Sequence, residues 1–190
     1  MAIAGLSVVG RESYGVFPLK GKLLNVLDIN DSKIAANEEI TNLKKIIGLE
    51  TSKKYKDVKP LRYGKIMVMT DQDVDGSHIK GLGINLFQSE WETLSKIPGF
   101  IGFMNTPILK AKKGSQELLF YNDGEYNSWK ENNDISGWKI KYYKGLGTST
   151  GNEFKEYFQN KKIVTFTHIG DTSDDSIRSS KYFTKSGQIS

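Results

Sequence analysis

Three aspartates at alternate positions, followed by a glycine, are the residues of this sequence best suited to chemistry. Asp71, Asp73 and Asp75 come directly after the short apolar run 66–69, which is typical of a buried strand, and Gly76 follows them. Ionised carboxylates this close together repel one another, and burying any of them unpaired is costly. A cation held among them removes both costs. Oxygen ligands without cysteine or clustered histidine favour Mg²⁺ or Ca²⁺ over zinc, so the motif predicts a divalent-metal site.

Three interpretations compete for this motif. Its first six positions match the calcium-binding EF-hand loop, Asp-x-Asp-x-Asp-Gly. That loop needs a bidentate glutamate at its twelfth position, where this sequence has Leu82, and it follows a helix, not a strand. An acidic turn that only caps the next helix needs a single aspartate. We favour the third interpretation, a catalytic Mg²⁺ site at the carboxyl ends of the strands of a parallel sheet.

Two basic segments could contact an anion. The run Lys144-Gly-Leu-Gly147 follows a predicted strand and precedes a helix expected over 151–159, with residues 148–150 as its cap. Glycines beside a lysine at such a place form a cradle of backbone N–H groups for an anion. In the loop Lys20-Gly-Lys22, two cations flank a glycine, which suits contact with phosphate or, alternatively, a solvated basic loop. His78 could contact a phosphate oxygen or have a structural role.

The elements that must position these residues alternate between strands and helices. This alternation predicts an α/β fold with a mostly parallel, Rossmann-like sheet flanked by helices on both faces. Asp31 or Ser32 can cap the first long helix, and Gly48 can end it. Lysines at 110–113 with Gly114 mark an exposed turn between two strands. The predicted helices are 31–47, 79–95, 123–132 and 151–159, and the predicted strands are 66–69, 100–110, 117–121, 138–143 and 163–169.

Composition restricts the class of protein. The chain has 190 residues, enough for a substantial core. Its 27 Lys and Arg against 22 Asp and Glu give a net charge of +5, a modest excess that favours a polyanionic partner. The absence of cysteine fits a reducing compartment. No apolar run approaches the roughly 20 residues of a membrane span, and no signal peptide opens the chain, so we expect an intracellular protein without membrane contact.

Three blocks carry a resemblance to a known family. Residues 70–80, Thr-Asp-Gln-Asp-Val-Asp-Gly-Ser-His-Ile-Lys, resemble the acidic motif of the TOPRIM domain of type IIA DNA topoisomerases, in their eukaryotic or large-DNA-virus form. Residues 4–11 with 14–25, and residues 141–150, are similar to two further blocks of that family, and all stand in the family's order. The resemblance implies a TOPRIM domain over residues 1–170, with residues 171–190 as a polar tail or linker towards the next domain.

The resemblance also implies roles for individual residues. Asp71, Asp73 and Asp75 would hold Mg²⁺, for which Mn²⁺ or Ca²⁺ could substitute. The family usually has arginine where Lys20 stands, so a bidentate contact there is lost while the charge is kept. No residue of the chain takes a catalytic role, because we expect the family's first strand and its glutamate motif to be missing. The expected contacts to double-stranded DNA are Lys20, Lys22, Asn25, His78, Lys144, Gly145 and Gly147.

The activity implied is reversible cleavage and religation of double-stranded DNA. In the family, a tyrosine of another domain attacks a backbone phosphodiester, and a further domain binds and hydrolyses ATP. The parent would work as an ATP-driven homodimer, whereas we expect this chain alone neither to cleave DNA nor to hydrolyse ATP. Its location would be the nucleus in a eukaryotic cell, or the host cytoplasm or virion for a virus.

Other classes share part of this pattern. A TOPRIM-type primase or nuclease has the same Asp-x-Asp chemistry, although it is not expected to combine Lys144–Gly147 with the block at 4–11. A phosphatase of the Asp-x-Asp type would use Asp71 as a covalent nucleophile. A non-catalytic module that binds DNA or a metal is a third alternative.

Overall fold

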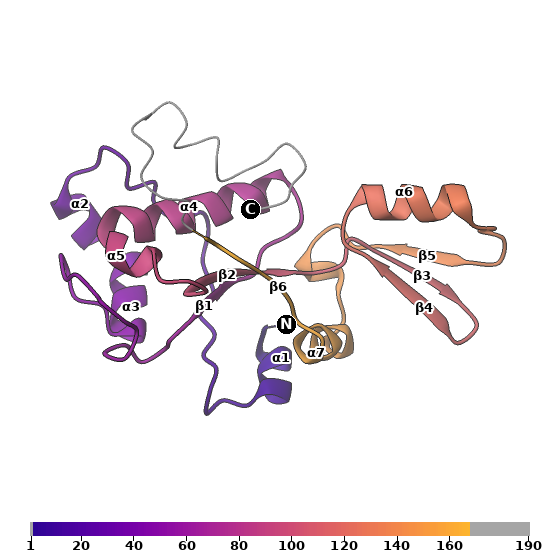
Figure 1. Cartoon of the computed structure of the whole chain (residues 1–190), viewed down its shortest axis with the longest axis horizontal. Helices are drawn as coiled ribbons and strands as arrows, with labels where there is room; N and C mark the ends of the chain where they lie inside the picture. The colour runs from indigo at the N-terminus through magenta and orange to yellow at the C-terminus, as the bar shows by residue number, and fades with distance from the viewer. Residues whose placement is uncertain (1, 168–190) are drawn as a thin grey trace. The chain divides into compact units, whose positions relative to one another are not determined.

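The computed structural model describes residues 2–167, with side chains from residue 6 onward (Figure 1). These residues gather into two compact units, each built from separate stretches of the chain. What we call the first unit comprises residues 2–16, 70–77 and 105–162, and the second unit comprises residues 17–69, 78–104 and 163–167. The predicted tail, 171–190, lies outside the described residues. The predicted extent of the domain, 1–170, stays a prediction.

The second unit holds the buried strand that precedes the acidic turn. Its sheet has the strand order β1-β2-β6, and β1 runs parallel to β2 with Ile66 opposite Ile101. The long helix α4, whose first turn belongs to the first unit, runs alongside this sheet (Figure 1). The elements of the second unit are β1 (Ile66–Val68), β2 (Ile101–Asn105), β6 (Lys162–Thr165), α2 (Asp31–Ala36), α3 (Glu38–Ile47), α4 (Val74–Glu90) and α5 (Glu92–Ser95).

The core of the second unit lies between these helices and the sheet. Trp91 is buried, and its indole Nε1 donates a hydrogen bond of 2.9 Å to the carbonyl oxygen of Glu50. Full burial of each large apolar side chain stabilises a fold by roughly 1.5–3 kcal/mol, so this core holds β1 and α4 firmly. These are the two elements that flank the acidic turn. The core side chains include Ile40, Ile47, Leu86, Phe87, Leu94, Phe100, Ile101 and Phe103.

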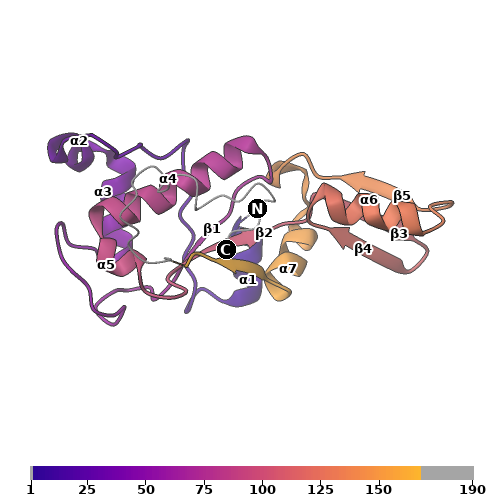
Figure 2. The same cartoon turned by 45° about the horizontal axis from the view of Figure 1, so that its top comes forward.

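The first unit is built on a second, antiparallel sheet. Its strand order is β4-β3-β5, and the hairpin between β3 and β4 turns at Gly114, as the sequence predicts. The lysines expected in that turn, Lys110, Lys112 and Lys113, lie in β3 instead. Helix α6 lies along one face of this sheet (Figures 1 and 2), and α1 packs against α7. The elements are α1 (Ala2–Val9), β3 (Leu109–Lys113), β4 (Gln116–Phe120), α6 (Asp123–Asn132), β5 (Lys139–Tyr142), the 3₁₀ turn η1 (Leu146–Thr148) and α7 (Gly151–Gln159).

The two faces of the antiparallel sheet differ in character because side chains alternate along a strand. Leu109 and Ala111 point into an apolar cluster with Phe120, Tyr126 and Trp129 of β4 and α6. The residues between them in β3 are Lys110 and Lys112, which lie opposite Lys141 and Lys139 of β5. The outer face therefore carries lysines from two neighbouring strands, which need carboxylate partners to offset their repulsion.

The predicted α/β class is confirmed, with some different element boundaries. The strand expected over 100–110 is two strands, β2 and β3, separated in sequence by Pro107, which has no N–H to donate to a neighbouring strand. They lie in different sheets, and the sheet that contains β3 is antiparallel. The helix expected over 31–47 is two helices, because Asn37 has an extended backbone and its side chain accepts from the backbone N–H of Ile40, starting α3. The helix expected from residue 79 begins at Val74, because the acidic turn itself caps it. Helix 151–159 is confirmed. Within the described residues, no helix has both the length and the apolar character needed to cross a membrane.

Candidate functional site

The acidic turn is tightly wound around its aspartates. Asp71 is half-buried, whereas Asp73 and Asp75 are exposed. Asp73 Oδ1 accepts a hydrogen bond of 2.7 Å from the backbone N–H of Gly76, which is the geometry of a helix N-cap. A Cβ on Gly76 would lie 1.8 Å from the carbonyl oxygen of Asp71, so no other residue fits there without moving the turn. One aspartate of the three therefore has the capping role that the sequence left open.

The acidic turn meets the glycine loop within the first unit. The backbone N–H of Leu146 donates a hydrogen bond of 2.5 Å to Asp71 Oδ1, although the two residues are 75 positions apart in the sequence. A Cβ on Gly145 would lie 2.6 Å from Asp71 Oδ2. Gly145 has an extended backbone, with φ 174°, that any residue can adopt. Glycine is needed there for space alone, because the aspartate carboxylate occupies the place of a side chain.

The two glycines of the Lys144–Gly147 loop are not equivalent. A Cβ on Gly147 would meet nothing within 4 Å, so this position opens to solvent. Lys144 is also exposed. The loop thus holds Asp71 on one side through Gly145 and Leu146, and leaves a lysine and a glycine accessible to an anion.

The acidic turn fits a hard cation in the chemistry of its donors, which are carboxylate oxygens. Thr70 Oγ1, next to Asp71, is buried without a hydrogen-bond partner among the described residues. This hydroxyl could therefore still form a hydrogen bond with a ligand or a water molecule at the turn. Across residues 2–167, no three acidic or histidine side chains gather closely enough to form a metal cluster. The structure therefore does not bring Asp71, Asp73 and Asp75 together as one ligand set. Mg²⁺ often uses only one or two carboxylates together with water and phosphate, and the aspartates suit that mode. Their assignment as ligands stays a prediction.

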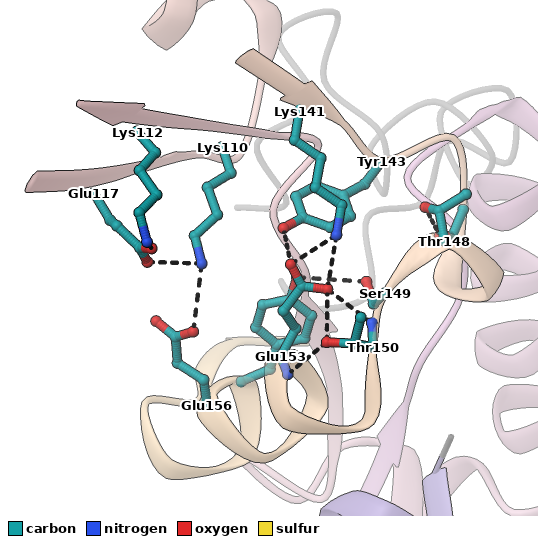
Figure 3. Close-up of polar contacts among 12 residues, drawn as sticks. Lys110, Lys112, Glu117, Lys141, Tyr143, Thr148, Ser149, Thr150, Glu153 and Glu156 are labelled. Atoms are coloured by element: carbon teal, nitrogen blue, oxygen red, sulfur yellow. Dashed lines mark hydrogen bonds and ion pairs between the residues drawn. The ribbon is translucent and has the colours of Figure 1, made fainter. Parts of the chain in front are cut away.

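The helix that follows the glycine loop begins with a capping box. Thr150 Oγ1 accepts from the backbone N–H of Glu153, and Glu153 Oε2 accepts a hydrogen bond of 2.7 Å from the backbone N–H of Thr150 (Figure 3). The cap within residues 148–150 is as the sequence predicts, whereas Glu153 is not among the predicted residues. The pattern Thr-x-x-Glu at 150–153 is the signal that could have found it.

The Glu153 carboxylate is also bound by two side chains that precede the glycine loop, Lys141 and Tyr143. Lys141 Nζ lies 2.8 and 3.0 Å from its two oxygens, and the Tyr143 hydroxyl donates to Oε1 at 2.5 Å (Figure 3). Burial alone would raise the pKa of Glu153, but the hydrogen bonds from Lys141, Thr150 and Tyr143 outweigh it and lower that pKa to about 2. The pKa of Tyr143 is raised, first by burial and then by its bond to Glu153. The carboxylate is therefore ionised, and the phenol protonated, at neutral pH.

A second ion-pair group connects the lysine face of the sheet to α7. Lys110 Nζ lies 2.7 Å from Glu117 Oε2 and 3.8 Å from Glu156 Oε2, and Lys112 Nζ lies 2.9 Å from Glu117 Oε1 (Figure 3). The Lys110 side chain is only 13% exposed. Glu117 of β4 and Glu156 of α7, together with Glu153 of α7, thus offset much of the lysine charge on this face.

The other predicted DNA contacts lie in the second unit. The side chains of Lys20, Lys22 and His78 are exposed, with His78 on α4. The backbone N–H of Lys20 donates to Glu39 Oε1 at 2.7 Å, which fixes the loop but not the lysine side chain. Asn25 Oδ1 accepts from the Leu27 N–H at 3.1 Å and from Asn85 Nδ2 at 3.0 Å, so this side chain has a structural role as well.

Comparison with known proteins defines the class. Residues 2–105 match the model of the Toprim domain, and residues 104–187 match that of the C-terminal associated domain of TOPRIM. The boundary between these matches coincides with the start of the first unit's longest stretch at Asn105.

The proteins most informative about the kind of TOPRIM protein are DNA topoisomerases. The chain is 56% identical over 179 residues to DNA topoisomerase 2 of Plasmodium falciparum, and 51% identical over 183 residues to DNA topoisomerase 2-beta of Homo sapiens, covering 92% and 93% of this chain. A crystal structure of the Plasmodium falciparum topoisomerase II DNA-binding, cleavage and re-ligation domain is similar with a TM-score of 0.85 and 51% identity over 95% of this chain. The chain belongs to the TOPRIM family, in the form found in type IIA DNA topoisomerases. It spans 13% and 11% of those two relatives and 26% of the crystallised chain.

Proposed function

We propose that this chain is the metal-binding TOPRIM part of an ATP-dependent type II DNA topoisomerase, an isomerase that cleaves and rejoins both strands of DNA. The observation that carries the proposal is the bond between Asp71 and Leu146. It joins the acidic motif to the Lys144–Gly147 loop, so the residues proposed for a metal and for a phosphate backbone belong to one site. The similarity to DNA topoisomerase 2 over more than nine tenths of the chain supports the same function.

The chemistry is a transesterification. The hydroxyl of a tyrosine in another domain loses its proton and attacks a DNA phosphorus, a phosphotyrosyl bond forms, and the bond to the 3′-oxygen breaks to leave a 3′-hydroxyl. The reverse reaction restores the DNA, because no bond energy is lost to water. A bound Mg²⁺ would stabilise negative charge on the leaving oxygen and anchor a phosphate.

The chain's own residues would bind and orient the DNA. Asp71, Asp73 and Asp75 are the proposed metal-holding carboxylates, and Asp75 lies on α4. Lys144 and the loop backbone at Gly145 and Gly147 would contact a phosphate, and Lys144 and Gly147 are not covered by protein. The contacts proposed in the second unit are Lys20, Lys22, Asn25 and His78.

The remaining requirements of the reaction would come from elsewhere in the parent protein. We propose that the tyrosine and the ATP-binding module lie in other domains, that the parent is a homodimer, and that it works in the nucleus, as the eukaryotic relatives suggest. The chain alone would then neither cleave DNA nor hydrolyse ATP.

Two substitutions in the intact enzyme test the metal role without disturbing the turn. Asp71→Asn and Asp73→Asn each keep an oxygen that can accept the backbone N–H seen in the structure, but they remove the charge. We expect each to reduce Mg²⁺-dependent DNA cleavage at least about 100-fold, since removing one charged transition-state contact commonly has such an effect. Cleavage is measured as linear DNA released from a supercoiled plasmid after denaturation.

Asp134→Asn provides the control, because this exposed aspartate lies beyond α6 and contacts Ser136 rather than the acidic turn. It should retain full cleavage. Wild-type cleavage rates in both Asp71→Asn and Asp73→Asn at every Mg²⁺ concentration would exclude the proposed metal role.

A further inference from the structure

The glycine loop is attached at both ends to a single side chain. Tyr143 precedes the loop and donates its hydroxyl to Glu153, while Thr150 follows the loop and donates both its backbone N–H and its hydroxyl to the same carboxylate. The two residues that flank the segment 144–149 are therefore bound to the same carboxylate. In between, the N–H of Leu146 holds Asp71.

The side of the loop before Gly145 is fixed to the antiparallel sheet. Tyr143 is 8% exposed, and its backbone N–H donates to the carbonyl oxygen of Ile108 at 2.8 Å. Lys141 of β5 lies with its Nζ 4.6 Å from the centre of the Tyr143 ring and also pairs with Glu153. The sheet therefore presents a cation and a phenol to the first turn of α7, and Glu153 connects the two.

These contacts exceed what a helix cap requires. A capping box consists only of the reciprocal bonds between Thr150 and Glu153. Lys141 of β5 and Tyr143, the residue after β5, add bonds from outside the helix, and the Glu153 side chain is only 14% exposed. Glu156, three residues on in the same helix, provides the contrast: its side chain is 42% exposed and has a single, longer contact with Lys110 at 3.8 Å.

We propose that Glu153 is a positioning residue for the candidate site: by joining β5 to the start of α7 it fixes the loop whose Leu146 N–H holds the Asp71 carboxylate. Glu153 touches neither Asp71 nor the proposed DNA-binding side chains, so it acts through the loop. The inference rests on the proposed function for its consequence, which is an Asp71 held ready for a metal and DNA. Its structural part is independent of that function.

The test is hydrogen exchange of the Leu146 amide in the intact protein carrying Glu153→Gln. Glutamine at this position still satisfies the capping box, but its neutral amide cannot serve Lys141, Tyr143 and Thr150 together. We expect the Leu146 amide, and with it the segment 144–149, to exchange about tenfold faster, as the loss of a charge-assisted hydrogen bond predicts. Helix α6 should exchange at its wild-type rate.

Glu156→Gln is the matched control, since it removes the same charge from the same helix without touching the loop. It should leave the exchange of segment 144–149 within about twofold of wild type. Equal exchange in Glu153→Gln and wild type overturns the inference. Equal acceleration in Glu153→Gln and Glu156→Gln overturns it too, because then the loss of charge on α7, and not the contacts of Glu153 with Lys141, Tyr143 and Thr150, would be responsible.

Tyr143→Phe covers the case in which Glu153→Gln unfolds the first unit. It removes one hydroxyl and keeps the packed ring, and it should accelerate exchange in segment 144–149 by a few-fold while α6 is unchanged. Unchanged exchange in that variant would contradict the inference. The two proposals can fail separately. If Glu153→Gln accelerates exchange in the loop but Asp71→Asn and Asp73→Asn cleave DNA at wild-type rates, the positioning role of Glu153 is retained and the proposed function is overturned.

Discussion

Gly145 and Gly147 stand two residues apart in one loop, yet their surroundings differ completely. The Asp71 carboxylate fills the space where a side chain on Gly145 would lie, at 2.6 Å, whereas nothing lies within 4 Å of the corresponding position on Gly147. The loop motif thus combines one glycine needed by the protein with one that faces outward. A substitution at each position separates these two needs.

We expect Gly145→Ala to lower the free energy of unfolding of the chain by about 1–3 kcal/mol, as overpacking of a tight site commonly does. The new methyl group must displace the carboxylate of Asp71 and with it the bond to Leu146. Gly147→Ala should change that free energy by less than about 0.5 kcal/mol, as for other exposed positions. Urea unfolding of both variants measures the difference. Equal free energies of unfolding of Gly145→Ala and Gly147→Ala would contradict the close contact between Gly145 and the Asp71 carboxylate.

Gly147→Ala has a second expected outcome, in DNA binding. If a phosphate approaches the open backbone at Gly147, the added methyl group should weaken DNA binding by the intact enzyme although the fold is unchanged. Fluorescence anisotropy with a labelled duplex measures this. Wild-type affinity in this variant would remove Gly147 from the proposed contacts.

Helix α7 is the element on which the candidate site depends, because its first turn ends the glycine loop. Its capping box and the Lys141–Tyr143–Glu153 contacts (Figure 3) hold that turn against β5. On the other flank, Lys110 reaches Glu156 of the same helix. The antiparallel sheet, far from the acidic turn in sequence, is therefore joined to the start of α7 through the Glu153 carboxylate.

This arrangement predicts a specific pH dependence. The pKa of Glu153 is lowered in the folded chain from its ordinary value of 4.5 to about 2, because its hydrogen bonds outweigh the effect of burial. The unfolded chain then binds more protons than the folded chain between these values, so the contribution of Glu153 is full above about pH 4.5 and is lost as the pH falls towards 2. The stability difference between wild type and Glu153→Gln should shrink over that range.

Urea unfolding of both proteins between pH 5.5 and pH 2.5, at about half-unit steps, measures that difference. Other carboxylates titrate in the same range, but they are common to both proteins and cancel in the comparison. If the difference in the free energy of unfolding stays constant with pH, the ionised Glu153 carboxylate does not stabilise the fold through these hydrogen bonds.

At the scale of the whole molecule, the excess of positive charge is small and its distribution matters more than its sum. The net charge is +5, yet several lysines on the antiparallel sheet are paired with carboxylates. Lys20, Lys22 and Lys144 are exposed in the two units and remain the proposed contacts to DNA phosphates. The lysines of the polar loop 49–62 are predicted from the sequence to face solvent rather than nucleic acid.

We therefore expect Lys20→Gln, Lys22→Gln and Lys144→Gln each to weaken DNA binding by the intact enzyme and to reduce the slope of log affinity against log salt by about 1, as the loss of one phosphate contact does. Lys56→Gln, in the solvent-assigned loop, should leave the slope unchanged. Anisotropy titrations over a series of salt concentrations provide both numbers. A smaller slope for Lys56→Gln alone would reverse the assignment of the two sets of lysines.

Local sequence was enough to predict much of the fold. Alternating apolar patterns and turn residues predicted the α/β class, the hairpin at Gly114 and the limits of α7, because these depend on neighbours within a few residues. The helix errors are local: Asn37 divides a helix by capping, and Asp73 starts α4 earlier than its apolar pattern suggests. The strand error is not local, because the run 100–110 contributes β2 to one sheet and the start of β3 to the other. Side-chain caps compete with periodicity and are weaker signals.

The sequence by itself determined which residues could do chemistry, since three aspartates on one turn and a lysine beside two glycines are fixed by spacing alone. Only the tertiary structure decided what they contact. It placed Leu146 on Asp71 across 75 residues of sequence, gave Gly145 its steric reason and brought Lys141 and Tyr143 to Glu153. Contacts between residues so far apart depend on how strands and helices pack, and a single sequence records that packing only through the residues that permit it.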